Sequence, residues 1–171
     1  MKLFTIKYLS KLYILHNLYF KHKYYLKRES YSDSGEDLYI LNNLGKSGFY
    51  VDVGCHHPTR LNNCHLLYLN GWSGINIDPN EISIKLFDFA RKKDTNICSA
   101  VSLKKGLVDF YYNKPLSLHN SLIKNKDLKN KKIVSSDTLN SILDKTKFKN
   151  RHIDFLSVDA EGKDLEVIQS L

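Results

Sequence analysis

The chain reads Phe49-Tyr50-Val51-Asp52-Val53-Gly54-Cys55-His56-His57-Pro58 at the point that decides its fold. Residues that favour β-structure run into a glycine and then a proline, a pattern typical of a buried parallel strand that ends in a tight loop. Because glycine has no side chain, the backbone of such a loop can approach a ligand closely. The pattern therefore predicts a strand over 49–53 and a ligand-binding loop directly after it.

Two further strands end on an acid in the same way. Gly74-Ile75-Asn76-Ile77-Asp78 is followed by Pro79, and the segment 153–159 ends on Asp159. The carboxyl ends of parallel strands meet at one edge of a sheet, so we expect Asp52, Asp78 and Asp159 to gather there. In doubly wound folds, a carboxylate at the end of the second strand can accept the ribose hydroxyls of a nucleotide. Together, the two strand-and-loop segments 49–58 and 74–79 indicate a nucleotide-like ligand.

Length and composition limit the class of protein. The chain has 171 residues, of which 42% are hydrophobic, and this is the size of one globular domain with a real core. Lys and Arg outnumber Asp and Glu by 26 to 18, which gives a net charge of +8 and favours anionic partners. The Lys-rich stretches 21–28 and 124–132 lack the aromatic spacing of an RNA-reading module, so no nucleic acid is expected.

The number of cysteines and the length of the apolar runs indicate the cellular compartment of the protein. Three cysteines in no repeated spacing argue against a disulfide framework and favour a reducing, cytoplasmic setting. The longest uncharged run near the start, 12–20, is short of the roughly 20 residues that a membrane span needs. No small-residue cleavage site follows it, so no signal peptide is expected.

The first 20 residues are predicted to form an amphipathic helix, because apolar residues recur at helical spacing over 3–20. These residues are Phe4, Tyr8, Leu12, Leu15 and Tyr19. We expect the helix to pack on its own domain, while a membrane-surface helix and a dimer contact stay open as alternatives. Residues 21–31 are interpreted as a basic linker, so the predicted organisation is 1–29 as helix and linker and 30–171 as the main domain.

The rest of the chain alternates between helix and strand, which predicts an α/β fold with a mostly parallel sheet and helices on both faces. Ser34 is expected to cap a short helix, with Asp37 capping back and Gly45 closing it. Asp137 or Ser136 is expected to cap a later helix. The other predicted helices span 61–69, 80–91 and 163–171, the last with Leu165, Ile168 and Leu171 on its apolar face, and the other strands span 95–101 and 107–112. Residues 113–134 are predicted to be a loop over one end of the sheet.

The order of these segments resembles the FkbM-type family of S-adenosylmethionine-dependent methyltransferases. The resemblance covers 30–171 and rests on five blocks in the same order. They are Ser-Gly-Glu-Asp at 34–37, Phe-Tyr-Val-Asp-Val-Gly at 49–54, His-Pro at 57–58, Gly-Trp-Ser-Gly-Ile-Asn-Ile-Asp-Pro at 71–79 and Phe-Leu-Ser-Val-Asp-Ala-Glu-Gly at 155–162. It implies a Rossmann-like class I methyltransferase fold and S-adenosylmethionine as cofactor. It also implies that the sheet lacks its last strands, so that the chain is a C-terminally truncated member.

The resemblance also assigns residues to the cofactor. It implies that the loop of Asp52, Val53 and Gly54 faces the methionine part and that Asp78 binds the ribose. It further implies that Cys98 and Ser99 lie near the adenine, that Asp159 lies near the methionine and the reacting centre, and that Glu36 belongs to the cofactor site. Carboxylates suit the sulfonium and ammonium of this cofactor, whereas a dinucleotide pyrophosphate needs backbone amides and a Gly-rich turn.

The reaction implied is methyl transfer to an oxygen of a sugar or a small hydroxylated metabolite. A base should take the proton of the acceptor hydroxyl, and the candidates in falling order are Asp159, Glu161 and His56. Asp159 can instead be occupied by the cofactor, and Glu161 can simply cap the helix that follows.

Four other interpretations stay open. One is a catalytically inactive module that associates with a copy of itself or with a completing partner through the open edge strand at 153–159. A metal site made of Cys55, His56, His57, Cys64 and His65 is disfavoured because it lacks the paired spacings of a structural zinc site. An NAD-dependent enzyme is disfavoured because no further glycines follow Gly54 at the required spacing. A glycosidase using Asp159 and Glu161 ranks last.

Overall fold

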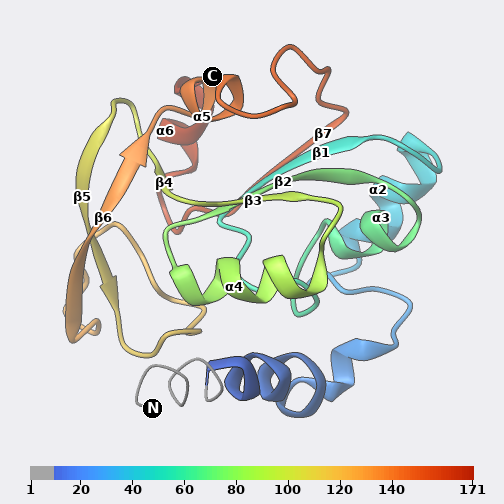
Figure 1. Ribbon diagram of the computed structural model, residues 1–171, viewed down its shortest axis with the longest axis horizontal. Helices are drawn as coiled ribbons and strands as arrows, with labels where there is room; N and C mark the ends of the chain where they lie inside the picture. The colour runs from blue at the N-terminus through green and yellow to red at the C-terminus, as the bar shows by residue number, and fades with distance from the viewer. Residues whose placement is uncertain (1–9) are drawn as a thin grey trace.

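The structure, a computed structural model, describes residues 10–171. Its centre is a four-stranded, all-parallel sheet in the order β3-β2-β1-β7, and a three-stranded sheet in the order β4-β6-β5 lies beyond the carboxyl ends of the parallel strands (Figure 1). The strands are β1 (Phe49–Val53), β2 (Ser73–Asp78), β3 (Thr95–Cys98), β4 (Ala100–Val101), β5 (Gly106–Tyr112), β6 (Asn130–Asp137) and β7 (Phe155–Val158). The helices are η1 (His16–Lys21), η2 (Lys23–Leu26), α2 (Glu36–Leu44), α3 (His65–Leu69), α4 (Glu81–Ala90), α5 (Leu139–Asp144) and α6 (Asp164–Gln169). The predicted α/β fold with a parallel sheet is confirmed.

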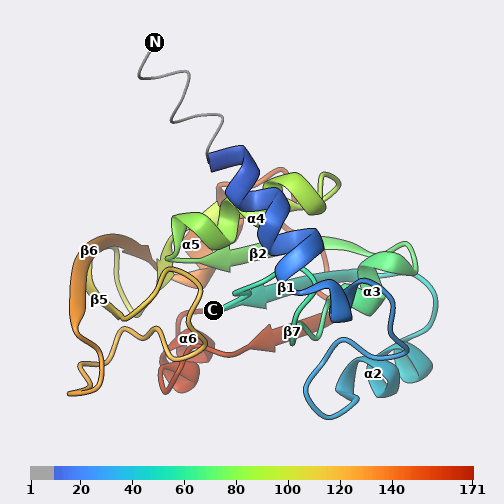
Figure 2. The ribbon, with the colours of Figure 1, turned by 90° about the horizontal axis from the view of Figure 1, so that it is seen from below.

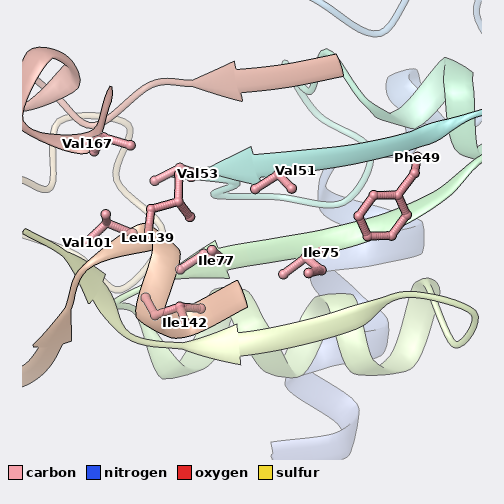
Figure 3. Close-up of a cluster of buried hydrophobic side chains, with 9 residues drawn as sticks. All are labelled: Phe49, Val51, Val53, Ile75, Ile77, Val101, Leu139, Ile142 and Val167. Carbon is pink, nitrogen blue, oxygen red and sulfur yellow. The ribbon is translucent and has the colours of Figure 1, made fainter. Parts of the chain in front are cut away.

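Helices cover both faces of the parallel sheet. α5 and α6 lie on one face, and α4 lies on the other (Figures 1 and 2). The first face carries the main apolar core, in which valine, isoleucine and phenylalanine side chains from β1 and β2 meet side chains from β4, α5 and α6 (Figure 3). The core residues are Phe49, Val51, Val53, Ile75, Ile77, Val101, Leu139, Ile142 and Val167. Alternate strand residues point to this face because successive side chains of a strand point to opposite sides.

The N-terminal helix packs on its own domain, as expected, and it does so on α4 through a face other than the predicted one. Residues 10–15 are α-helical and continue into η1, while η2 lies inside the predicted linker. Leu18 is buried and packs against Leu86 of α4, whereas Leu12 and Tyr19 of the predicted stripe are exposed. The predicted positions Phe4 and Tyr8 lie outside the described residues. A one-residue error in the phase of a helical stripe turns it by about 100°, because a helix has 3.6 residues per turn.

The start of α2 differs from the predicted cap. Gly35 is the N-cap residue, with φ at 92°, and Ser34 makes no side-chain cap. Ser32 takes this role, because its hydroxyl accepts the N–H groups of Gly35 and Asp37 at 3.0 and 3.4 Å. Asp37 is fully buried and holds the preceding loop rather than capping back. Gly45 ends the helix as predicted, and its N–H donates to a carbonyl of the last turn.

The chain between α4 and α5 is more ordered than predicted. The single strand expected over 95–101 divides at Ser99, because β3 pairs with β2 while β4 pairs with β6. The expected loop 113–134 is shorter, because β6 begins at Asn130 and pairs antiparallel with β5. Thr138, rather than Asp137 or Ser136, caps α5 by accepting the N–H of Ser141 at 3.1 Å.

Two helices differ in extent or orientation from their prediction. The helix expected over 61–69 begins only at His65. In α6 the buried residue is Val167, while the predicted apolar face is exposed, with Leu165 at 68%, Ile168 at 54% and Leu171 at 51%.

Within 10–171, no helix is both long and apolar enough to cross a membrane.

Candidate functional site

A cavity of about 410 Å³ lies at the carboxyl ends of β1, β2 and β7, and this volume is in the range of small-molecule sites. Its floor is formed by residues at these strand ends and its far wall by the three-stranded sheet and the loop after β5. Carboxylate side chains line it from five positions: Asp33, Glu36, Asp78, Asp159 and Glu161. No Lys or Arg from residues 10–171 lines it, although the chain carries a net charge of +8.

Gly54 stands at the centre of the floor, in the left-handed region with φ at 77°. A Cβ atom added there would lie 1.9 Å from the carbonyl oxygen of Asp159. The close approach of the end of β7 therefore requires a glycine at this position, independently of any ligand. This contact joins the loops after β1 and β7, and the N–H of Asp159 donates to the carbonyl of Val53 at 2.9 Å.

Asp78 is the most enclosed carboxylate of the cavity, with 7% of its surface exposed. One oxygen accepts the N–H of His56 at 2.9 Å and the other accepts the N–H of Asn80 at 2.7 Å. Burial raises the pKa of Asp78 to about 6, although these two hydrogen bonds act in the opposite direction. A carboxylate held by two backbone donors keeps lone pairs that can accept further hydrogen bonds from a ligand.

Asp159 and Glu161 lie at the other end of the cavity, on the turn after β7. Among residues 10–171, no hydrogen bond reaches the carboxylate of Asp159. Burial, and then the nearby charge of Asp164, raise the pKa of Asp159, and burial followed by the charge of Asp159 raises the pKa of Glu161. Glu161 does not cap α6, because it lies ahead of the N-cap residue Lys163.

His56 lines the cavity on the Asp78 side, because its own N–H holds that carboxylate. Its backbone has a φ of 50°. Burial lowers the pKa of His56 to about 4, so the ring is neutral and only weakly basic near pH 7. His56, Asp159 and Glu161 line the same cavity, and the role of each as a base stays a prediction.

Asp52 lies behind the cavity wall rather than in it. Its carboxylate accepts the side-chain amide of Asn62 at 2.9 Å, and the amide oxygen of Asn62 accepts the guanidinium of Arg91 at 2.6 Å. Arg91 is fully buried and also donates to the hydroxyl of Tyr50 at 3.0 Å, which in turn donates to Asp94 at 2.5 Å. Burial raises the pKa of Asp52, while Arg91 and Asn62 lower it. Val53 and Gly54 of the same segment do line the cavity.

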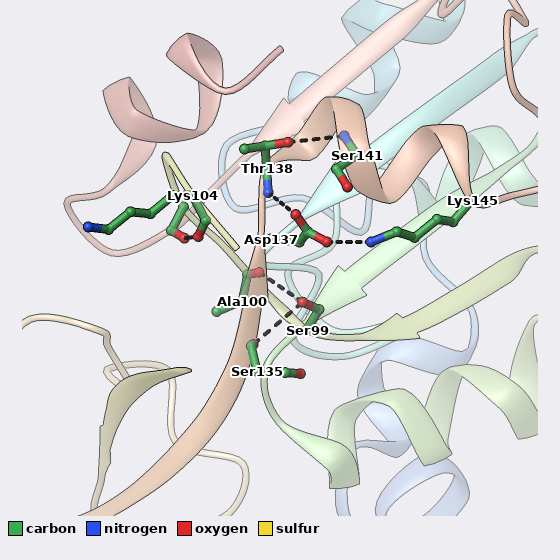
Figure 4. Close-up of polar contacts among 9 residues, drawn as sticks. Ser99, Ala100, Lys104, Ser135, Asp137, Thr138, Ser141 and Lys145 are labelled. Atoms are coloured by element: carbon green, nitrogen blue, oxygen red, sulfur yellow. Dashed lines mark hydrogen bonds and ion pairs between the residues drawn. The ribbon is translucent and has the colours of Figure 1, made fainter. Parts of the chain in front are cut away.

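The two residues predicted near the adenine are placed differently. Ser99 lines the cavity, and its N–H donates to the carbonyl of Asp78 at 3.2 Å. Its hydroxyl donates to the carbonyls of Ala100 and Ser135 at 2.9 and 3.5 Å, where the chain passes between the sheets (Figure 4). Cys98 is exposed and does not line the cavity, and its thiol lies 3.9 Å from the carbonyl of Pro79.

Several cavity residues were missed by the sequence interpretation. Asp33, Phe110, Asn120 and Leu122 are the clearest cases. The amide- and serine-rich composition of 113–134 was the available signal, since it indicated a loop over one end of the sheet. Ser121 links that loop to the turn after β7, donating from its hydroxyl to the carbonyl of Glu161 at 3.2 Å.

The metal interpretation finds no support in the geometry. Within the described part of the chain, no three His, Cys, Asp or Glu side chains are grouped so as to hold a metal ion. Cys55 and Cys64 are buried free thiols. The Nδ1 atom of His57 accepts backbone N–H groups of the following turn, including that of Thr59 at 3.2 Å.

The parallel sheet with helices on both faces, and the cavity at its carboxyl edge, define the chain as a Rossmann-like α/β protein. A family model described as the methyltransferase FkbM domain matches residues 52–171, so the chain belongs to the FkbM methyltransferase family. No curated protein and no solved structure matches it significantly.

Proposed function

We propose that the chain is an S-adenosylmethionine-dependent O-methyltransferase that acts on a sugar or another small hydroxylated metabolite. The observation that carries the proposal is the charge of the cavity. Five carboxylates and no Lys or Arg of residues 10–171 line it, in a chain of net charge +8. Such a cavity favours a cationic ligand, and S-adenosylmethionine carries a sulfonium and an ammonium group.

The residues present fit this cofactor at both ends of the cavity. Asp78 can accept the two ribose hydroxyls, because each of its oxygens has a lone pair left after its backbone hydrogen bond. Apolar side chains such as Phe110 and Val101 offer a wall for a flat base beside Ser99. At the other end, Asp159 and Glu36 offer charges for the ammonium. When bound, S-adenosylmethionine supplies an electrophilic methyl group.

The chain's own contribution to the reaction is proposed to be positioning and proton transfer. Asp159 or Glu161 takes the proton of an acceptor hydroxyl, since both line the cavity and partial burial raises the pKa of each carboxyl. Asn63, Asn120 and Ser121 line the same cavity and offer hydrogen bonds to an acceptor with several hydroxyls.

Calorimetric titration with S-adenosylmethionine tests the proposal on the natural chain, on Asp78→Ala and on the matched control Asp144→Ala. Asp144 is an exposed acid at the end of α5, away from the cavity. We expect the first variant to bind about 100-fold more weakly, because two charge-assisted hydrogen bonds are lost. The control should bind like the natural chain. A folded natural chain that binds no cofactor would contradict the proposal and favour the alternative, an inactive module that acts by association.

The pH dependence of the same titration sharpens the role of Asp78. Its pKa is raised to about 6, and only the ionised carboxylate can accept two hydroxyls without donating. Affinity should therefore be constant above about pH 7 and fall by up to about tenfold for each pH unit below about pH 6. Asp78→Asn should remove this dependence. An unchanged pH profile in the variant would show that another group controls binding.

A further inference from the structure

The N-terminal helix carries a face that is exposed among the described residues 10–171. We define this outer face as Leu12, Tyr13, His16, Tyr19 and Phe20, together with Tyr24 of the following η2. All six are exposed, with Phe20 at 70% and Tyr24 at 66%. His16 and Phe20 stack on each other at a centroid distance of 6.4 Å.

The opposite face of the same helix is already occupied. Leu18 and Ile14 pack against Leu86, Ile82 and Phe89 of α4, and Figures 1 and 2 show the two helices lying against each other. A helix on a protein surface normally turns polar side chains away from its packed face. Here the outer face is largely aromatic as well. Among residues 10–171, Tyr19 is the one member of this face with a ring contact to α4, to Phe89 at a centroid distance of 6.4 Å, so packing on α4 does not explain the rest of the face.

The charged side chains of the segment 10–28, which carries the helix and η2, have one sign except for its histidines, which are neutral or cationic. Residues 10–28 carry five cations, Lys11, Lys21, Lys23, Lys27 and Arg28, and the first acid of the whole chain is Glu29. None of these cations forms an ion pair with a carboxylate among residues 10–171. The guanidinium of Arg28 lies over the ring of Tyr24, 4.3 Å from its centre.

We propose that this outer face binds the surface of a membrane that contains anionic lipids. Tyrosine and phenylalanine suit the boundary between headgroups and acyl chains, and flanking Lys and Arg attract anionic headgroups. A second copy of the chain fits less well, because it would bring two clusters of cations together. The proposal does not depend on the proposed function, since the outer face and the cavity have no residue in common.

A tryptophan reporter tests the contact directly. The natural chain has one tryptophan, Trp72, which is 1% exposed and so insensitive to an external surface. We expect the fluorescence of Phe20→Trp to shift to shorter wavelength with vesicles of phosphatidylcholine and phosphatidylserine at roughly 2:1. Tyr39→Trp, at a position on α2 that is 72% exposed, is the matched control and should not respond. No shift in the first variant, or an equal shift in both, overturns the proposal.

Vesicle co-sedimentation of the full chain measures the contribution of each group. Phe20→Ser should reduce partitioning about tenfold and Lys23→Gln about fivefold, whereas Tyr39→Ser and the exposed Lys92→Gln should leave it unchanged. Partitioning should weaken with added salt and with vesicles of phosphatidylcholine alone. Equal partitioning of the natural chain and Phe20→Ser, or retention by RNA in place of vesicles, rejects the membrane contact. Cofactor binding by Phe20→Ser should equal that of the natural chain, so a failure here is distinguishable from a failure of the proposed function.

Discussion

The two faces of the four-stranded sheet are built by the same strands but held in different ways. On the face under α5 and α6, the residues at 49, 51, 53, 75 and 77 form an apolar core. On the opposite face, Tyr50, Asp52 and Asn76 are buried just as deeply, but they belong to a network of hydrogen bonds around Arg91 and Asp94. Packing is non-directional and tolerates some change of shape, whereas a buried polar network requires every partner. The polar face should therefore respond more sharply to single substitutions and to pH.

The largest effect is expected for Arg91→Met. Arg91 is fully buried and its guanidinium bonds to Tyr50, to Asn62 and to the carbonyl of Pro58. Its removal takes a charged donor away from all three groups, although Tyr50 and Asn62 keep hydrogen bonds to Asp94 and Cys64, and should lower the free energy of unfolding by about 4 kcal/mol. Denaturant unfolding measures the loss, with the exposed Lys92→Met as control. A loss below about 1 kcal/mol would mean that the network is replaceable by packing.

A slightly smaller effect is expected on the apolar face. Leu139 of α5 is fully buried against the sheet, so Leu139→Ala should cost about 3 kcal/mol through lost burial and the cavity left behind. Leu165→Ala removes the same atoms from a side chain that is 68% exposed and should change stability by less than about 0.5 kcal/mol. Equal losses in the two variants would contradict the observed orientation of α6.

Low pH should lower the stability of the fold through the polar face. There, His65 of α3 lies buried against Tyr31, with ring centres 4.4 Å apart. Burial lowers the pKa of His65 to about 2, while an unfolded histidine titrates at about 6.5. The unfolded chain binds more protons between these values, so stability falls as the pH drops below about 6.5. Between pH 7 and pH 5 this residue should cost about 2 kcal/mol.

His65→Phe keeps a ring beside Tyr31 and removes the titration, so it should lose that share of the pH dependence. The exposed His152→Phe is the control and should keep it. Unfolding curves at several pH values measure both slopes. An identical slope for His65→Phe and the natural chain would show that the ring of His65 is already protonated in the folded state.

The smallest effect is expected for Tyr50→Phe, which removes a single hydroxyl from the polar network. That hydroxyl accepts a hydrogen bond from Arg91 and donates one to Asp94. The expected loss is about 1 kcal/mol, because Arg91 and Asp94 keep other partners. Tyr39→Phe, at an exposed position on α2, should be neutral. Chemical denaturation compares the two variants, and a neutral Tyr50→Phe would show that the ring alone matters on this face.

The parallel strands and their acids were predictable because local patterns specify them. The run 49–53 is followed by a glycine, the run that ends on Asp78 by a proline, and the segment that ends on Asp159 by a turn that contains Gly162, and all three show β-favouring residues. Parallel strands joined by helices bring their carboxyl ends to one edge, so the positions of Asp78 and Asp159 beside one cavity follow from order along the chain. The roles proposed for these acids toward a cofactor stay predictions.

The sequence by itself determined the class of fold, the family and the edge of the sheet at which the cavity lies. Tertiary structure alone decided that Asp52 turns away into the network of Arg91, that α6 buries Val167 in place of its predicted stripe, and that Val101 and Phe110 of the three-stranded sheet line the cavity. The physical reason is the range of the interactions. A strand or a turn is set by neighbouring residues, whereas the face that a side chain finally buries depends on segments that meet only after the chain has folded.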